Sequence, residues 1–203
     1  MLVKICGIRT EEAAHAAVES GADMIGLVFA ESRRKVTLEQ ASRVLKVVEG
    51  RSIKTAGVFR NQSVEAVNQI CRTLGLDYAQ LHGDESSDYC RQINGKIIKA
   101  LSISSLGEAS DFQDCSDFLL IDSPEPGSGE AFDWNRLKDT SLSLPYILAG
   151  GLTPENVGPA IEAMSPQGVD VSSGVETDGT KDTKKIRRFI REARHSSNRE
   201  EER

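Results

Sequence analysis

The segments Tyr146-Ile-Leu-Ala-Gly-Gly151 and Gly168-Val-Asp-Val-Ser-Ser-Gly174 are short apolar runs that end abruptly in small residues. Both are typical of buried strands that open at their C-terminal ends into tight turns. Such turns expose backbone N–H groups with no large side chain in the way, and these groups bind phosphate. Either turn alone would be interpreted as an ordinary turn, but two at the ends of consecutive strands favour a phosphate site. Its predicted residues are Gly150, Gly151, Ser172, Ser173 and Gly174.

Short apolar runs alternate with amphipathic stretches along the whole chain. Eight runs predict strands, at Val3–Ile8, Met24–Phe29, Lys54–Phe59, Tyr78–His82, Lys96–Leu101, Phe118–Asp122, Tyr146–Ala149 and Val169–Val171. The helical stretches between and after them are Glu11–Ser20, Leu38–Val48, Val64–Leu74, Ser87–Ile93, Leu106–Phe112, Trp134–Lys138, Pro154–Met164 and Lys184–Ala193. This alternation predicts an α/β protein whose parallel sheet closes as a (β/α)8 TIM barrel. The alternative, an open doubly wound sheet, would need fewer strands or a Gly-rich loop after the first, and Cys6-Gly7-Ile8-Arg9 is not GxGxxG.

A single barrel domain is predicted over residues 1–194, because 203 residues without a visible linker are too few for two ordinary domains. Thr153 before Pro154 predicts a helix start, and Gly21 and Gly75 predict helix ends. Residues 195–203 are polar and charged, which predicts a frayed tail. The stretch Ser123–Phe132, rich in Pro, Gly, Ser and Glu, predicts a long loop at the active face.

Composition excludes several classes of function. A net charge of −6 without a basic stripe argues against nucleic-acid binding. Local basic clusters are still compatible with the binding of a small anionic ligand. No apolar stretch approaches the roughly 20 residues that span a bilayer, and the chain starts directly in a strand pattern. We therefore expect a cytoplasmic protein with no membrane partner. The four cysteines lack CxxC or disulfide-scaffold spacing, and no His, Cys and Asp cluster has metal spacing, so we expect no metal and no redox cofactor.

Cys6 and Asp122 stand at the ends of apolar strands, where a barrel places its chemistry. The Cys6 thiol could act as a base if nearby cations lower its pKa, with Lys4 and the Arg33–Lys35 loop as candidate activators. The alternative is a buried structural cysteine. Asp122 adjoins an apolar core, where desolvation favours the neutral acid, although a loop-anchoring aspartate is equally compatible with the sequence. An acid and a base on strands one and six suit proton transfer between adjacent carbons, which is isomerisation.

Two further residues are candidate substrate contacts. Arg34 could hold a second anionic group, because guanidinium and carboxylate form a bidentate pair. The alternative is a solvated charge run at Arg33–Lys35. His82, in Gln80-Leu-His-Gly83, is predicted to lie in the network at a strand end with a minor role.

Several motifs resemble the phosphoribosylanthranilate isomerase family. They are Lys4-Ile-Cys-Gly-Ile8, Glu19-Ser-Gly-Ala-Asp23, Gln80-Leu-His-Gly83, Phe132-Asp-Trp134, Ala149-Gly-Gly-Leu152, Pro154-Glu-Asn-Val157 and Val169-Asp-Val-Ser-Ser-Gly-Val175, covering nearly the whole chain in order. The resemblance implies an Amadori rearrangement of N-(5-phosphoribosyl)anthranilate in tryptophan biosynthesis. It implies that Cys6 is the general base, Asp122 the general acid and Arg34 the contact to the anthranilate carboxylate. The turns after strands seven and eight would hold the phosphate of this small substrate. The protein is expected to be a monomer or a homodimer, and the sequence does not decide between the two.

Two loops depart from the family pattern. Ala30-Glu31-Ser32-Arg33-Arg34 lacks an expected proline, which leaves the choice between Arg33 and Arg34 open. The loop Ser123-Pro-Glu-Pro-Gly-Ser-Gly-Glu-Ala131 is less Gly-rich than is common. Competing functions are another phosphosugar barrel, such as a ribulose-phosphate epimerase or an indole-forming lyase, and a non-catalytic phosphometabolite-binding barrel. The epimerase would want metal ligands at strand ends, which are missing, and the non-catalytic barrel predicts loss of Cys6 or Asp122.

Overall fold

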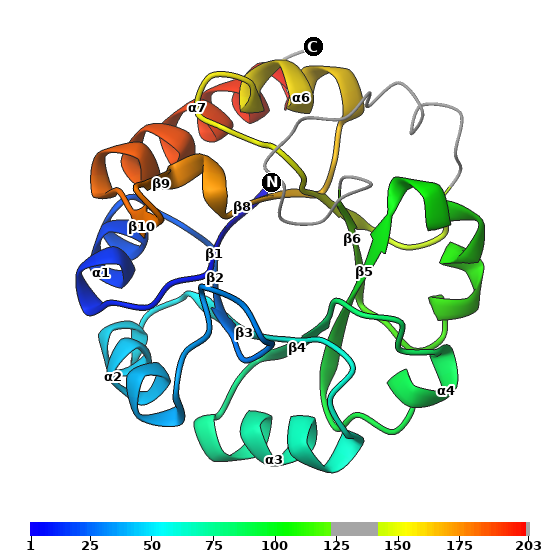
Figure 1. The fold of residues 1–203 in the computed structure, drawn as a ribbon. Coiled ribbons are helices and arrows are strands. Elements are labelled where there is room, and N and C mark those ends of the chain that lie inside the picture. Colours follow the sequence, from blue (N-terminus) through cyan, green and yellow to red (C-terminus); the bar gives the residue numbers. More distant parts are fainter. Residues whose placement is uncertain (123–141, 202–203) are drawn as a thin grey trace.

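Eight parallel strands close into a barrel in which each strand pairs with the next along the chain (Figure 1). The structure is a computed structural model and describes residues 1–122 and 142–201. The strands are β1 Leu2–Cys6, β2 Met24–Val28, β3 Lys54–Phe59, β4 Tyr78–Leu81, β5 Lys96–Ser102, β6 Phe118–Asp122, β7 Tyr146–Leu148 and β8 Gly168–Val171. Pairing of β8 with β1 completes the ring and sets Lys4 directly opposite Asp170. The predicted (β/α)8 barrel is confirmed, and an open sheet is excluded.

Helices surround the barrel as an outer ring (Figure 1). The helices are α1 Glu11–Glu19, α2 Leu38–Val48, α3 Val64–Leu74, α4 Ser87–Cys90, the 3-10 helix η1 Ile103–Phe112, α6 Val157–Met164 and α7 Thr183–Glu201. A 3-10 turn η2 (Ser173–Val175) and a hairpin of β9 (Glu176–Thr177) and β10 (Thr180–Lys181) follow β8. Gly21 and Gly75 take left-handed conformations (φ 84° and 63°) just after α1 and α3, as predicted. The predicted loop Ser123–Phe132 and helix Trp134–Lys138 lie outside the described residues.

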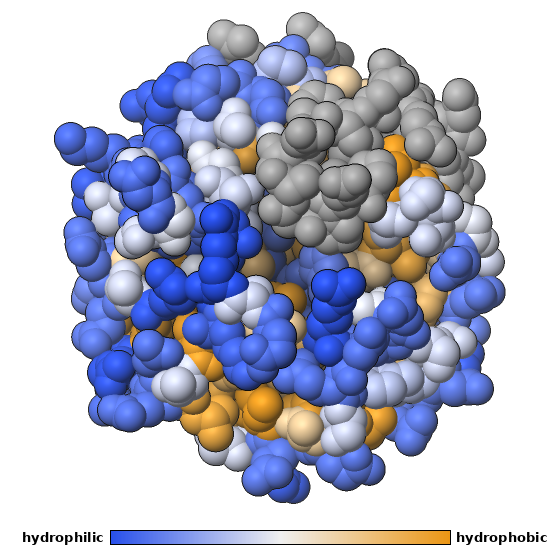
Figure 2. All heavy atoms as spheres, viewed as in Figure 1, coloured by the Kyte–Doolittle hydropathy of each residue, from blue (hydrophilic) through white to orange (hydrophobic). Residues whose placement is uncertain are grey.

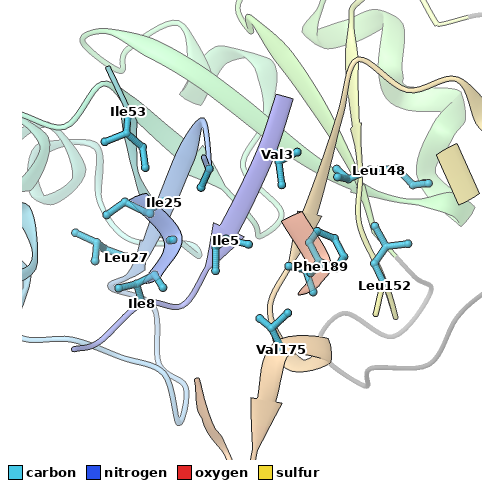
Figure 3. Packing of buried hydrophobic residues seen from close by; sticks show 14 of the residues in the cluster. Val3, Ile5, Ile8, Ile25, Leu27, Ile53, Leu148, Leu152, Val175 and Phe189 are labelled. Atoms are coloured by element: carbon cyan, nitrogen blue, oxygen red, sulfur yellow. The ribbon is translucent and has the colours of Figure 1, made fainter. Parts of the chain in front are cut away.

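Apolar side chains form two layers because successive residues of a strand face opposite sides of the sheet. The larger layer lies between strands and helices, where Val3 and Ile5 of β1 share a cluster with Phe189 of α7 (Figure 3). A smaller cluster inside the barrel contains Met24, Ala56, Tyr78, Ile98 and Leu120. On β1 the alternate residues Lys4 and Cys6 therefore face the barrel interior, where Cys6 shares a third, small apolar cluster with Val28, Ala30 and Val58.

One polar side chain clamps each odd strand to the next even strand at the N-terminal edge of the barrel. The residue just before the even strand accepts the backbone N–H of a residue on the odd strand. The pairs are Asp23 with Val3 (2.7 Å), Asp77 with Thr55 (2.9 Å), Asp117 with Ile97 (2.8 Å) and Gln167 with Tyr146 (2.9 Å). In a TIM barrel this edge serves stability, whereas chemistry lies at the opposite edge.

The predicted start of the helix after β7 was wrong by three residues, since α6 begins at Val157 and not at Pro154. Thr153 and Asn156 instead build a polar turn, in which Asn156 Oδ1 accepts the Thr153 N–H (2.7 Å) and Thr153 Oγ1 accepts the Glu155 N–H (3.2 Å). Asn156 Nδ2 also donates to the Gly151 carbonyl (2.9 Å), so the turn supports the glycine pair after β7.

A frayed tail was predicted over residues 195–203; in its described part, residues 195–201, α7 continues to Glu201, and residues 202–203 lie outside the described residues. Arg194 donates to the carbonyls of Met1 (2.5 Å) and Gly21 (2.8 Å) and pairs with Asp23. Ser196 and Ser197 are buried, and Ser196 lies against Gly158 of α6. These polar residues are ordered by tertiary contacts that a hydrophobic pattern does not reveal.

The substitution Asp77→Ala is expected to lower the free energy of unfolding by about 1–2 kcal/mol at neutral pH, because Thr55 loses the acceptor for its N–H and hydroxyl. Although burial raises the pKa of Asp77, the hydrogen bonds from Thr55 and Lys54 outweigh burial and lower it. This stabilisation is therefore present above the pKa of an unfolded aspartate and is lost as pH falls through the lower folded-state pKa.

Urea unfolding at neutral and acidic pH measures both effects. The control is Asp88→Ala, which removes an exposed carboxylate paired with Arg91 and should change stability little. Equal losses in the two variants would contradict the role of the clamp.

Candidate active site

A cavity of about 190 Å³ opens at the C-terminal ends of the barrel strands. The residues predicted from the sequence that line it are Cys6, Arg34, His82, Asp122, Gly150, Gly151, Ser172 and Ser173. Hydrophilic residues dominate the face of the barrel shown in Figure 2. Closure of the sheet thus brings together residues that lie more than 160 positions apart, such as Cys6 and Ser172, whose hydroxyl donates to the Cys6 carbonyl (3.3 Å).

The two small-residue turns meet at one side of this cavity. Gly150 and Gly151 both have positive φ (78° and 66°), and no residue in the described part of the chain accepts their N–H groups. Ser172 follows β8, and Ser173 begins η2. Gly174 packs behind the wall, where a Cβ atom would lie 1.9 Å from the Leu152 carbonyl oxygen. The missing side chain of Gly174 therefore lets the second turn touch the first, and its predicted contact with phosphate stays a prediction.

Cys6 lies next to a buried cation inside the barrel. A Cβ atom on Gly26 of β2 would lie 2.7 Å from Cys6 Sγ and 3.1 Å from Lys4 Nζ, so this glycine leaves room for both groups. Lys4 is fully buried, and its Nζ is 2.9 Å from Asp170 Oδ1. Burial lowers the pKa of Lys4, but Asp170 and Cys6 outweigh it and raise it, so Lys4 remains charged.

The pKa of the Cys6 thiol is raised, whereas the sequence suggested that nearby cations could lower it. Burial raises the pKa of Cys6; Lys4 and Lys181 lower it, and Asp170 raises it further. The net result is a raised pKa for Cys6, because in the free protein the cations offset only part of the effect of burial. Lys4 is the predicted activator that the structure places beside the thiol, whereas Arg33 and Arg34 bond to Glu176 and Lys35 pairs with Glu31.

Asp122 ends β6 and is joined to a chain of polar side chains. Its Oδ2 is 3.2 Å from His82 Nε2, and His82 Nδ1 is 3.1 Å from Gln80 Nε2. With the Gln80 amide donating, a neutral His82 accepts at Nδ1 and donates its Nε2–H to Asp122. His82 therefore lies in the strand-end network, as predicted, and it orients the carboxylate.

The two candidate arginines occupy different places. Arg34 lines the cavity with a side chain that is 13% exposed, whereas the Arg33 side chain is 62% exposed and lies outside its wall. The stem of Arg34 lies over Gly7, where a Cβ atom would approach Arg34 Cδ to 2.8 Å. Arg34 is thus the arginine that can contact a molecule in this cavity.

Sequence reasoning missed Glu176 and Lys181, which face each other across the β9–β10 hairpin. Lys181 Nζ donates to the Ser172 carbonyl (2.7 Å) and to Glu176 Oε1 (2.8 Å), at the edge of the second turn. A signal was present, because Asp178-Gly179 is a two-residue hairpin turn with φ values of 51° and 74°. Asp170 and Gln80 were also missed as parts of the network.

The described residues include neither a membrane-spanning helix nor a group of side chains suited to a metal ion. Their helices include none with the length and apolarity required to cross a membrane. Their His, Cys, Asp and Glu side chains form no group of three or more suited to a metal ion.

Comparison with known proteins gives consistent results. The family profile described as N-(5′phosphoribosyl)anthranilate (PRA) isomerase matches residues 3–192. The N-(5′-phosphoribosyl)anthranilate isomerase of Streptococcus pneumoniae (strain Hungary19A-6) is 45% identical over 193 residues, which is 95% of this chain and 96% of the relative. A solved phosphoribosyl anthranilate isomerase in complex with reduced 1-(o-carboxyphenylamino)-1-deoxyribulose 5-phosphate is 35% identical, with a TM-score of 0.83 and coverage of 96% of this chain and 100% of that one. Monomers of the dimeric enzyme from Thermotoga maritima give 35% identity, a TM-score of 0.82 and the same coverage.

Replacing Lys4 with methionine is expected to raise the pH at which Cys6 becomes reactive. Removal of the ammonium takes away one of the two cations that lower the thiol pKa, while burial and Asp170 still raise it. The rate of Cys6 alkylation by iodoacetamide, followed by peptide mass spectrometry across a pH series, measures this midpoint.

The matched control is Lys99→Met on β5, which removes another buried lysine paired with a carboxylate, that of Glu85. It should leave the alkylation midpoint of Cys6 in place. An unchanged midpoint in Lys4→Met, or equal shifts in both variants, would exclude a specific influence of Lys4.

Proposed function

This chain belongs to the N-(5′-phosphoribosyl)anthranilate isomerase family, and from that premise we propose that Cys6 is its general base and Asp122 its general acid. The protein is an isomerase of tryptophan biosynthesis, which converts N-(5′-phosphoribosyl)anthranilate into the corresponding 1-deoxyribulose 5-phosphate. The observation that carries the assignment of roles is that Cys6 of β1 and Asp122 of β6 line one cavity beside the glycine and serine turns. An acid and a base on separate strands can act on different atoms of one substrate.

Asp122 acts first, by donating a proton to the ring oxygen of the ribose. The bond from that oxygen to C1 breaks, and the nitrogen lone pair forms a C1=N double bond, which gives an open-chain protonated Schiff base. His82 supports this step because its hydrogen bond orients the Asp122 carboxyl toward the cavity. Positioned acids of this kind contribute about 10²–10⁴ to rate.

Cys6 acts next, as a thiolate that removes the proton from C2. The C2–H electron pair forms a C1=C2 bond, and the former C1=N electrons return to nitrogen, which gives an enolamine. Protonation of C1 and loss of the proton from the C2 hydroxyl produce the aminoketose with no net change in protons. The ammonium of Lys4 favours this thiolate, since it lowers the cost of placing negative charge at a buried sulfur.

The two ends of the substrate require two anion sites. Gly150, Gly151, Ser172 and Ser173 surround one side of the cavity with backbone donors and hold the phosphate in this proposal. Arg34 holds the anthranilate carboxylate, because its guanidinium lines the same cavity. Holding both ends fixes C1 and C2 between the acid and the base.

We also propose that the enzyme acts in the cytoplasm on this small phosphorylated substrate, as a monomer or homodimer. A related structure holds a reduced phosphorylated analogue, and the Thermotoga maritima relative is dimeric. Light scattering of the purified protein separates the two states, because one chain has a mass of 22.1 kDa.

The substitutions Cys6→Ser and Asp122→Asn are each expected to lower kcat by about 10²-fold or more, because each removes a proton-transfer group. Both variants should still bind the reduced product analogue. The fluorescence of phosphoribosylanthranilate, generated in place from anthranilate and phosphoribosyl pyrophosphate, follows turnover as it decays.

Cys71→Ser is the matched control, because Cys71 is a buried thiol on α3 that does not line the cavity. It should keep wild-type kcat. Near-normal turnover by Cys6→Ser would contradict the assignment of Cys6 as the base, whatever the turnover of Asp122→Asn.

A further inference from the structure

Glu176 places a buried carboxylate where three cations converge beside the cavity. Its side chain is 5% exposed and accepts bonds from Arg34 Nε (2.7 Å), Arg34 Nη2 (3.0 Å), Lys181 Nζ (2.8 Å) and Arg33 Nη2 (3.1 Å). Burial raises the pKa of Glu176, but the bonds from Arg34 and Lys181 outweigh it and lower the pKa to about 2. The carboxylate is therefore charged throughout the neutral range and acts as a fixed acceptor.

Glu176 binds one edge of the Arg34 guanidinium and leaves a second edge available to another acceptor. Glu176 occupies Nε and Nη2, and among the described residues no acceptor is bonded to Nη1. The remaining N–H groups on Nη1 and Nη2 form a second edge suited to a bidentate carboxylate. Because the Arg34 stem also lies over Gly7, the side chain is held from both ends.

Lys181 extends the same network to the turn after β8. Its Nζ bonds to Glu176 Oε1, the Ser172 carbonyl (2.7 Å) and Ser172 Oγ (3.3 Å), and its side chain is 5% exposed. Ser172 in turn donates to the Cys6 carbonyl. The arginine, the serine turn and the strand end of Cys6 are thus joined by consecutive bonds.

The charges of this network are unequal. Among the groups shielded from solvent, one carboxylate, that of Glu176, faces the cations Arg34 and Lys181, so one positive charge remains uncompensated, whereas Arg33 is exposed to solvent. A ligand with separate phosphate and carboxylate groups, which together carry about −2.5 to −3 at pH 7, would offset that positive charge.

We propose that Glu176 is a positioning residue that aims Arg34 at the substrate carboxylate and, through Lys181, ties it to the phosphate turn. The proposal rests on the function proposed above for Arg34 and the two turns. Glu176 itself touches no reacting atom. Its effect is on binding geometry, because a guanidinium freed from it can adopt other rotamers and loses the directed second edge.

The substitution Glu176→Gln, which keeps shape and removes charge, is expected to raise KM for phosphoribosylanthranilate about 10-fold with a smaller change in kcat, since directed charge-assisted bonding is lost. Arg33→Ala is the control, because it removes an exposed contact to the same carboxylate and should leave KM unchanged. Glu176→Asp keeps the charge on a shorter stem and should fall between the two, and melting temperatures show which variants are folded.

A double-mutant cycle with Arg34→Ala separates positioning from general support of the fold. If Glu176 acts through Arg34, adding Glu176→Gln to Arg34→Ala raises KM no further. Multiplicative losses, or a wild-type KM in Glu176→Gln, would overturn the proposal.

Wild-type turnover, together with calorimetric binding of the reduced product analogue, tests the family reaction separately. If the wild-type protein turns over phosphoribosylanthranilate and Glu176→Gln has the same KM, only the positioning role of Glu176 is refuted. A wild type that neither turns over nor binds the analogue refutes both proposals.

Discussion

Pairing of β1 with β8 is the constraint on which the rest of the site depends. It sets Lys4 opposite Asp170, and their ion pair lies inside the barrel at the seam where the sheet closes. Breaking such a buried pair on one side costs about 3–5 kcal/mol, because the remaining charge is left uncompensated. The closure also brings Ser172 to the Cys6 backbone and allows Arg34 to lie over Gly7. A chain in which β8 did not return to β1 would therefore lose the neighbours of its thiol and both proposed anion sites together.

Electrostatics divide the cavity into regions with different tasks. On the Cys6 side, the cations Lys4 and Lys181 both favour negative charge at sulfur. On the Asp122 side, His82 lies within hydrogen-bonding distance of both the carboxylate and the Gln80 amide, and this contact orients the carboxyl. Two environments with different charges allow one group to give a proton while another takes one. The net upward shift in the Cys6 pKa means that full reactivity requires more than the cations of the free protein.

Strand positions and the barrel could be predicted from sequence because buried parallel strands are short apolar runs with clear turn signals. The cavity residues followed because strand C-termini gather at one edge of a closed sheet. What could not be predicted depends on long-range contacts. Ser196 packs against Gly158, and Gly174 packs against the Leu152 carbonyl. The direction of the Cys6 pKa shift depends on a balance among burial and three charges. The β9–β10 hairpin was too short for a hydrophobic pattern, and the Asp178-Gly179 pair was its one local signal. The sequence could not show which of Arg33 and Arg34 lines the cavity, because the two are adjacent in one charged run. Only the fold separates them.

In the proposed mechanism, barrel closure places Cys6 and Asp122 on either side of the substrate carbons that exchange protons. A crystal structure of this protein with reduced 1-(o-carboxyphenylamino)-1-deoxyribulose 5-phosphate tests that claim most directly. We expect the phosphate at Gly150, Gly151, Ser172 and Ser173, the carboxylate on Arg34, and C2 at about 3–3.5 Å from Cys6 Sγ, which is a near-attack geometry. A phosphate bound elsewhere, or C2 beyond contact of Cys6 with the analogue fully bound, would contradict it.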